Sequence, residues 1–135
     1  MTHHSIDIRI YYEDTDAGGV VYHASYLKFG ERGRTEFLRH LGHQNSDLER
    51  EYGTLFLVRH IEIDYHRPAV LDDLLRLETA IESMKNTSFT MRQRFFRGEE
   101  LIADMRVVLV CVDTNAIKPV RLPGIVRDEF INFIE

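Results

Sequence analysis

Four long extended segments follow one another in the second half of the chain, and they limit how the chain can fold. We expect strands at residues 55–65, 73–84, 88–97 and 100–113, each long for a strand. In the first of them, Leu55, Leu57, Ile61, Ile63 and Tyr65 are predicted to share one face. The links at residues 68–72, 85–87 and 98–99 are short enough for antiparallel neighbours, so the sequence predicts a meander.

One long helix is predicted ahead of these strands. Beginning at Ser25 and ending before Gly42, it carries on one face the apolar residues Tyr26, Phe29, Phe37, Leu38 and Leu41. Gly30 and Gly33 lie inside it, and each costs a helix about 1 kcal/mol relative to alanine. We therefore expect another element to approach the backbone of this helix closely.

The two ends of the chain complete the predicted domain. Residues 6–12 alternate apolar and polar side chains, as a half-buried strand does, and a short amphipathic helix is expected from Val126 to the C-terminus. A single helix on an antiparallel sheet is an α+β arrangement, and we expect one domain covering residues 1–135.

Composition excludes several classes of protein. The chain has 135 residues, a net charge of -5 and one cysteine. Its negative charge argues against nucleic acid or an anionic lipid surface as a partner. No apolar stretch is long enough for a transmembrane segment, and with a single cysteine and no predicted leader we expect the reducing cytoplasm.

The loop before the long helix concentrates the residues that can carry chemistry. Its sequence YYEDTDAGGVVYHAS places carboxylates, His23 and two glycines directly ahead of a helix start. The free N–H groups there can hold an oxygen that becomes negative during acyl transfer, and a neighbouring carboxylate can activate water. In an arbitrary loop, Asp14 and Asp16 would only bind backbone amides and the glycines would only form a turn.

The run YYEDTDAGGVVYHASYL, followed by ERGRTEFLR, closely resembles the YbgC-type branch of the hotdog-fold thioesterases in the 4-hydroxybenzoyl-CoA thioesterase family. The similarity continues through DYHRPAVLDD, SMKNTSF and VCVDTNAIKPVRLP. It implies a long central helix wrapped by a curved five- or six-stranded antiparallel sheet. It also implies a homodimer or homotetramer whose sheets join edge to edge, hydrolysis of acyl-CoA and a role in lipid metabolism.

The resemblance also implies the site residues. Asp16 matches the second aspartate of the family motif and is expected to act as nucleophile or general base, assisted by His23 and lined by Tyr12. Substrate contacts are expected from Gly19, Val20, Tyr22, Lys85 and Ser88. No cofactor and no metal are expected, because the histidines lack metal-ligand spacing.

Several questions stay open at this point. Acyl-carrier protein is an alternative to CoA as the carrier of the acyl group, and the preferred acyl group is not indicated. A hydratase or dehydratase of the same fold would pair His23 with Glu31 or Glu36. A protein that binds acyl carriers as a scaffold would keep the fold without catalysis.

Overall fold

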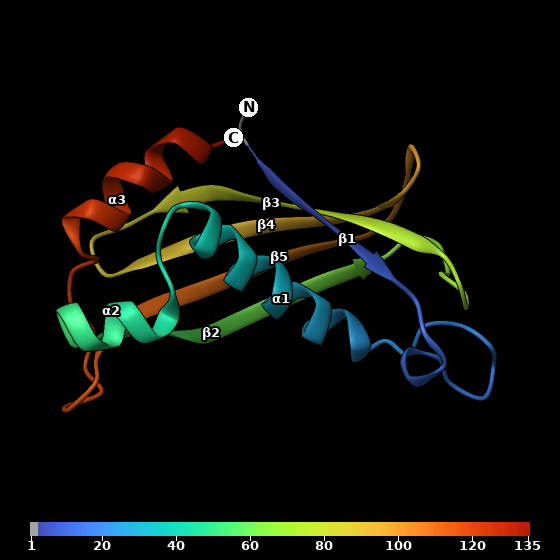
Figure 1. Ribbon diagram of the computed structural model, residues 1–135, viewed down its shortest axis with the longest axis horizontal. Helices are drawn as coiled ribbons and strands as arrows, with labels where there is room; N and C mark the ends of the chain where they lie inside the picture. The colour runs from blue at the N-terminus through green and yellow to red at the C-terminus, as the bar shows by residue number, and fades with distance from the viewer. Residues whose placement is uncertain (1–2) are drawn as a thin grey trace.

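The computed structural model describes residues 3–135. Its strands are β1 (His4–Arg9), β2 (Thr54–Tyr65), β3 (Leu74–Met84), β4 (Ser88–Arg97) and β5 (Glu100–Asp113). Its helices are α1 (Ser25–His40), α2 (Asn45–Tyr52) and α3 (Gly124–Phe130), with short 3₁₀ turns η1 (Tyr12–Asp14) and η2 (Ile131–Phe133). Figure 1 shows α1 lying across one face of a curved sheet, with α2 and α3 toward one end of it.

All five strands form one antiparallel sheet in the order β1-β3-β4-β5-β2. The α+β class is therefore confirmed, and the hairpins β3–β4 and β4–β5 are those that the short links predict. The prediction of a meander is wrong for its first link, because β2 pairs with β5 and not with β3, the strand that follows it. The link from β2 to β3 crosses the end of the sheet, where His66 and Arg67 both donate their N–H groups to the Ile102 carbonyl.

The predicted face of β2 is also wrong in its first half. The pairing of β2 with β5 shifts between Val58 and His60, so Arg59 is an additional residue that reverses the alternation. As a result, Phe56 packs against the core before the bulge, Ile61 and Ile63 do so after it, and Leu57 stays 40% exposed. Sequence periodicity does not reveal a bulge, because an inserted residue looks like any other.

Helix α1 packs on the sheet along the predicted apolar face. Tyr26, Phe29, Phe37 and Leu38 are buried, and Gly42, with φ of +90°, follows the helix end. The close approach expected at the internal glycines is confirmed. A Cβ at Gly33 would lie 2.6 Å from Leu77 Cδ2 of β3, and one at Gly30 would overlap with Met105 Cε of β5.

The ends of the sheet differ in part from the prediction. Strand β1 ends at Arg9 and not at Tyr12 as predicted. The 3₁₀ turn η1 begins at Tyr12, and the Asp14 carboxylate accepts the N–H of Tyr11 just before it. Helix α2 was not predicted from its polar sequence. The C-terminal helix is confirmed as α3. The ring centroid of its Phe130 lies 5.7 Å from that of Phe37 and 5.0 Å from that of Phe89. No helix of residues 3–135 is long and apolar enough to cross a membrane.

Candidate active site

The loop between η1 and α1 forms a small, well-fixed turn. The Asp16 N–H donates to the Val20 carbonyl at 2.9 Å, and the Gly19 N–H donates to the Asp16 carbonyl at 3.0 Å. Gly19 has φ of +82°, a conformation that favours glycine. The Val21 N–H donates to the Ala69 carbonyl at 2.8 Å, so the link between β2 and β3 anchors this loop.

The Asp16 carboxylate is exposed and held by one of its two oxygens. Its Oδ1 accepts the Gly18 N–H at 2.8 Å, and a Cβ at Gly18 would lie only 3.1 Å from this oxygen. Its Oδ2 has no hydrogen-bond partner in the described part of the chain. The amide contact fixes the orientation of the carboxylate and leaves the second oxygen available to a substrate or a water molecule.

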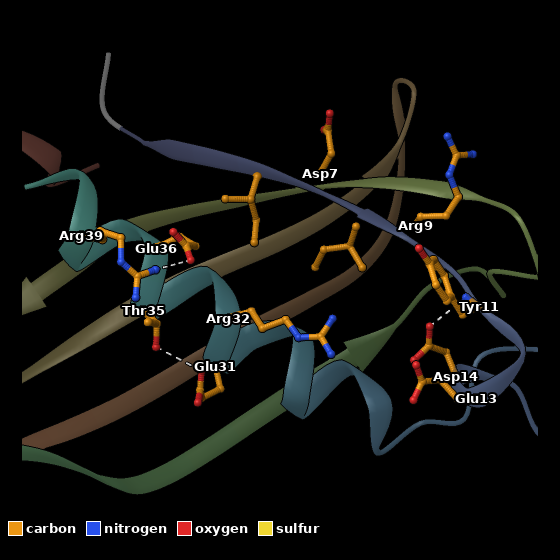
Figure 2. A pocket seen from close by; sticks show the side chains of 12 residues that line it. Asp7, Arg9, Tyr11, Glu13, Asp14, Glu31, Arg32, Thr35, Glu36 and Arg39 are labelled. Carbon is orange, nitrogen blue, oxygen red and sulfur yellow. Dashed lines mark hydrogen bonds and ion pairs between the residues drawn. The ribbon is translucent and has the colours of Figure 1, made fainter. Parts of the chain in front are cut away.

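Asp14, by contrast, is part of the loop framework. Its Oδ2 accepts the Tyr11 N–H at 2.8 Å, and its carbonyl accepts the Tyr22 N–H at 2.8 Å. Figure 2 shows Asp14 beside Tyr11 at one end of a hollow of about 420 Å³ between β1 and α1. Charged side chains line this hollow, and Asp16 is not among them. The two aspartates therefore differ in both contacts and surroundings.

Asp16 lines another hollow, of about 330 Å³, together with His23, Tyr26, Tyr65 and the link residues that follow β2. The Tyr65 hydroxyl donates to the His23 carbonyl at 3.0 Å. Tyr26 is 3% exposed and packs edge to face on Tyr65, with ring centroids 5.4 Å apart. Burial raises the pKa of Tyr26 to about 12, so this phenol stays protonated near neutral pH and cannot serve as a base.

The start of α1 adds backbone donors beside the same hollow. The helix begins at Ser25, two residues after His23. Within residues 3–135, the His23 N–H donates to no backbone carbonyl. An unpaired N–H at a helix start favours negative charge, so this group can hold a carbonyl oxygen that is becoming an oxyanion.

The other expected site residues in and beside the loop differ in their surroundings. Val20 lines the hollow of Asp16, and Gly19 belongs to the same loop. Tyr22 is 47% exposed, with its ring 4.5 Å from that of His23. Tyr12 is 81% exposed and lines a different hollow, with Tyr11 and Leu71.

Lys85 and Ser88 lie far along the sheet from the Asp16 loop. Lys85 is in the turn between β3 and β4, where its N–H donates to the Ser88 carbonyl, and Ser88 opens β4. Figure 1 shows this turn at one end of the long axis and the loop before α1 at the other. One copy of the chain thus does not bring these two residues to Asp16.

The pairing of His23 with Glu31 or Glu36 that a hydratase would need is not formed. Neither glutamate lines the hollow that contains His23. Glu31 accepts the Thr35 hydroxyl at 3.1 Å, and Glu36 accepts a hydrogen bond from Arg39. In the described residues, no three His, Cys, Asp or Glu side chains are grouped as a metal site requires.

Tyr65 and Tyr26 were not among the residues expected in the site. Both belong to stretches that carry the family resemblance, DYHRPAVLDD and HASYL, so a signal was present. Periodicity assigned both rings to packing faces. Only the three-dimensional structure reveals that the Tyr65 hydroxyl reaches a carbonyl 42 residues away in sequence.

Replacement of Tyr65 by phenylalanine is expected to lower kcat by about tenfold, because a small displacement of a catalytic group is costly. The variant removes the donor to the His23 carbonyl and leaves the ring in place. Steady-state turnover of a thioester, the substrate that the sequence resemblance implies, measures the effect. Tyr52→Phe is the matched control, since Tyr52 is similarly exposed at 45% but lies at the end of α2. Equal rates for both variants would contradict a positioning role for Tyr65.

Comparison with known proteins agrees with the fold. Residues 11–130 match the family profile described as the thioesterase-like superfamily. The acyl-CoA thioester hydrolase YbgC of Escherichia coli O6:H1 is 48% identical over 124 residues, covering 91% of this chain and 92% of the relative. The acyl-CoA thioesterase YbgC of Haemophilus influenzae is 44% identical over 126 residues, covering 93% of each.

A solved structure of a probable thioesterase from Bartonella henselae is 42% identical with a TM-score of 0.85, covering 90% of this chain and 99% of that one. The chain belongs to the thioesterase-like superfamily. It is a thioesterase with the hotdog fold, as the resemblance of its sequence implies.

Proposed function

We propose that this thioesterase hydrolyses acyl-CoA to a free acid and CoA, with Asp16 as the nucleophile or general base. The observation that carries the proposal is the free Oδ2 of Asp16 in a hollow shared with His23, whose N–H lacks a backbone partner at the start of α1. The YbgC relatives, which are named as acyl-CoA thioesterases, support CoA as the carrier.

The chemistry follows from these two groups. The His23 N–H donates a hydrogen bond to the thioester carbonyl oxygen and stabilises the negative charge that develops on it. Asp16 either attacks the carbonyl carbon, forming a mixed anhydride and releasing thiolate, after which water hydrolyses the anhydride to the free acid and the Asp16 carboxylate, or it removes a proton from the water that attacks the thioester directly. The Gly18 N–H holds one carboxylate oxygen while the other reacts, and the Tyr65 hydroxyl fixes the His23 peptide.

We infer that the working unit is at least a dimer joined through β2. This strand is at the edge of the sheet, and Leu57 and Val58 are 40% and 46% exposed on it. Its Tyr65 end lies beside the Asp16 loop of the same copy, while Phe56, paired with Cys111, lies near Ser88, paired with Val110.

A two-fold axis that pairs two β2 edges antiparallel places the Tyr65 end of one copy beside the Thr54 end of the other. The Asp16 loop of one copy then approaches Lys85 and Ser88 of its partner. This arrangement explains how the expected substrate residues can belong to one site although they lie at opposite ends of the sheet in a single copy.

We place the enzyme in the cytoplasm, in keeping with its unpaired, buried Cys111.

A thiol-release assay tests the proposed function. Short, long and aromatic acyl-CoA thioesters and acyl-carrier protein thioesters are compared, with and without a chelator. We expect turnover of at least one CoA thioester that the chelator does not reduce. Loss of activity on chelation and its recovery with zinc would contradict the carboxylate mechanism, whereas hydrolysis of every thioester at only a background rate would favour a scaffold.

A further inference from the structure

A pocket with an apolar floor lies between α1, α2 and the sheet, away from the hollow of Asp16 in the same copy. Its volume is about 450 Å³, within the range of small-molecule sites. The apolar lining comes from Leu38, Leu55, Phe56, Phe89, Met91 and Leu109. Arg34 of α1 is the one basic side chain in the lining, which also contains the carboxylates of Glu31 and Glu49.

The position of Arg34 is set by a buried amide. Gln93 of β4 is fully buried, and its Nε2 donates to the Gly30 carbonyl at 2.9 Å and to Thr79 Oγ1 at 3.1 Å. These contacts leave its Oε1 to accept a hydrogen bond from Arg34 at 3.1 Å. Gly30 makes room for the pair, because a Cβ there would lie 3.2 Å from Gln93 Oε1 and 3.3 Å from the guanidinium.

Arg34 is a half-buried cation with a neutral partner. Among the described residues it forms no salt bridge, and Gln93 is the acceptor of its one hydrogen bond. A guanidinium has five N–H donors, so most of those on Arg34 remain available. Burial lowers the pKa of Arg34, an effect that the nearby Glu31 opposes. Since Glu31 does not form an ion pair with the guanidinium, the free N–H donors of Arg34 can take up a ligand oxygen at this position.

The proposed dimer brings the reacting groups to this pocket. Leu55, Phe56 and Val58, at the Thr54 end of β2, line it. In the two-fold pairing of β2 edges, this end lies beside the Tyr65 end of the partner and therefore near the partner's Asp16 loop.

We propose that this pocket holds the acyl group of the substrate and that Arg34 recognises an acceptor oxygen carried on that group, away from the thioester. The inference rests on the proposed thioesterase function and adds a specificity determinant to it. The apolar floor takes the carbon chain, and Gln93 aims the guanidinium at the oxygen. A carboxylate can accept two parallel N–H bonds from Arg34, whereas a hydroxyl accepts one.

The test compares three CoA thioesters with six-carbon chains: hexanoyl-CoA, 6-hydroxyhexanoyl-CoA and adipoyl-CoA. We expect kcat/KM for at least one oxygenated thioester to exceed that for hexanoyl-CoA by about tenfold or more, because a site that hydrogen-bonds a substrate discriminates against an analogue without the oxygen. Whichever of 6-hydroxyhexanoyl-CoA and adipoyl-CoA is hydrolysed with the higher kcat/KM shows whether Arg34 prefers a hydroxyl or a carboxylate. In Arg34→Met the ratio should fall toward one.

Arg32→Met is the control, since Arg32 lies on the same helix but does not line this pocket. It should keep the parental ratio. Equal rates for the three thioesters in the parent enzyme would overturn the inference and leave the thioesterase function intact.

Mixed dimers test whether the pocket serves the partner's Asp16. A dimer of one Asp16→Asn subunit and one Arg34→Met subunit contains one site with both parental residues if the two come from different copies, and none if they come from the same copy. A statistical mixture should therefore recover about a quarter of the parental rate on the oxygenated thioester. Recovery no greater than the sum of the two separate variants would contradict the shared site.

If no CoA thioester is hydrolysed, the proposed function fails, and binding of the free acids still tests the pocket. Adipate or 6-hydroxyhexanoate should then raise the Tm of the parent more than hexanoate does, and Arg34→Met should remove this difference. No difference among the acids in the parent would overturn the inference independently of turnover.

Discussion

Asp16→Asn is expected to lower kcat for thioester hydrolysis by at least about a hundredfold, the usual scale for loss of a general base or nucleophile. An asparagine oxygen can still accept the Gly18 N–H that Asp16 Oδ1 accepts at 2.8 Å, so the loop should stay folded. The substitution removes the negative charge that either attack on the carbonyl or activation of water requires. Thiol release measures the rate, and a thermal melt checks folding.

Asp14→Asn is the internal control. Asp14 lies two residues away, has the same charge and likewise accepts a backbone N–H, from Tyr11 at 2.8 Å. It does not line the hollow that contains Asp16 and His23. A catalytic role for Asp16 predicts that the asparagine variant at this control position keeps most of the parental rate. If both variants stay folded and within about tenfold of the parent, the assignment of Asp16 is wrong and the scaffold hypothesis returns.

Much of the fold follows from local pattern alone. The limits of β4 and β5, at residues 88–97 and 100–113, agree with those that periodicity and turn residues predict. The start of α1 at Ser25 is also as predicted. Both the alternation of side chains along these strands and the turns between them are set by residues close in sequence, so a single sequence is enough to predict them.

The features that were not predicted depend on partners distant in sequence. The pairing of β2 with β5 joins residues such as Thr54 and Asp113, and no local signal distinguishes it from a hairpin with β3. The bulge at Arg59 changes which face of β2 is buried without changing composition. Helix α2 has one buried apolar residue, Leu48, and a single apolar position cannot produce a helical periodicity of hydrophobic residues in the sequence.

In the candidate site, too, the residues that local sequence identifies differ from those that only distant contacts bring in. The loop residues Asp16 and His23 were found from types and spacing, because a carboxylate, a helix start and glycines stand together in one stretch. Tyr65 joins them through a contact across 42 residues. Lys85 and Ser88 are separated from them in one chain, and only a second copy is proposed to unite them.

Breaking the β2 edge is expected to produce monomers and to lower kcat/KM by about a hundredfold or more, because Asp16 and the residues that bind the substrate would then be on separate molecules. Leu57→Glu combined with Val58→Glu places two carboxylates per copy on the strand through which the copies are proposed to meet, and the one at Val58 also faces the pocket between α1, α2 and the sheet. Like charges facing one another across a strand pair are destabilising. Light scattering measures the mass, and thiol release measures the rate on the same samples.

The matched control is Ile125→Glu combined with Ile131→Glu. These two residues are 48% and 54% exposed, slightly more than Leu57 and Val58, and lie on α3 and η2 rather than on the sheet edge. This variant adds the same charge to exposed aliphatic positions and should remain a dimer with the parental rate. A monomeric β2 variant with full activity would show that each copy carries a complete site. A β2 variant that stays dimeric and active would show that the copies meet through another surface, since two pairs of glutamates cannot be accommodated in a paired edge without loss of affinity.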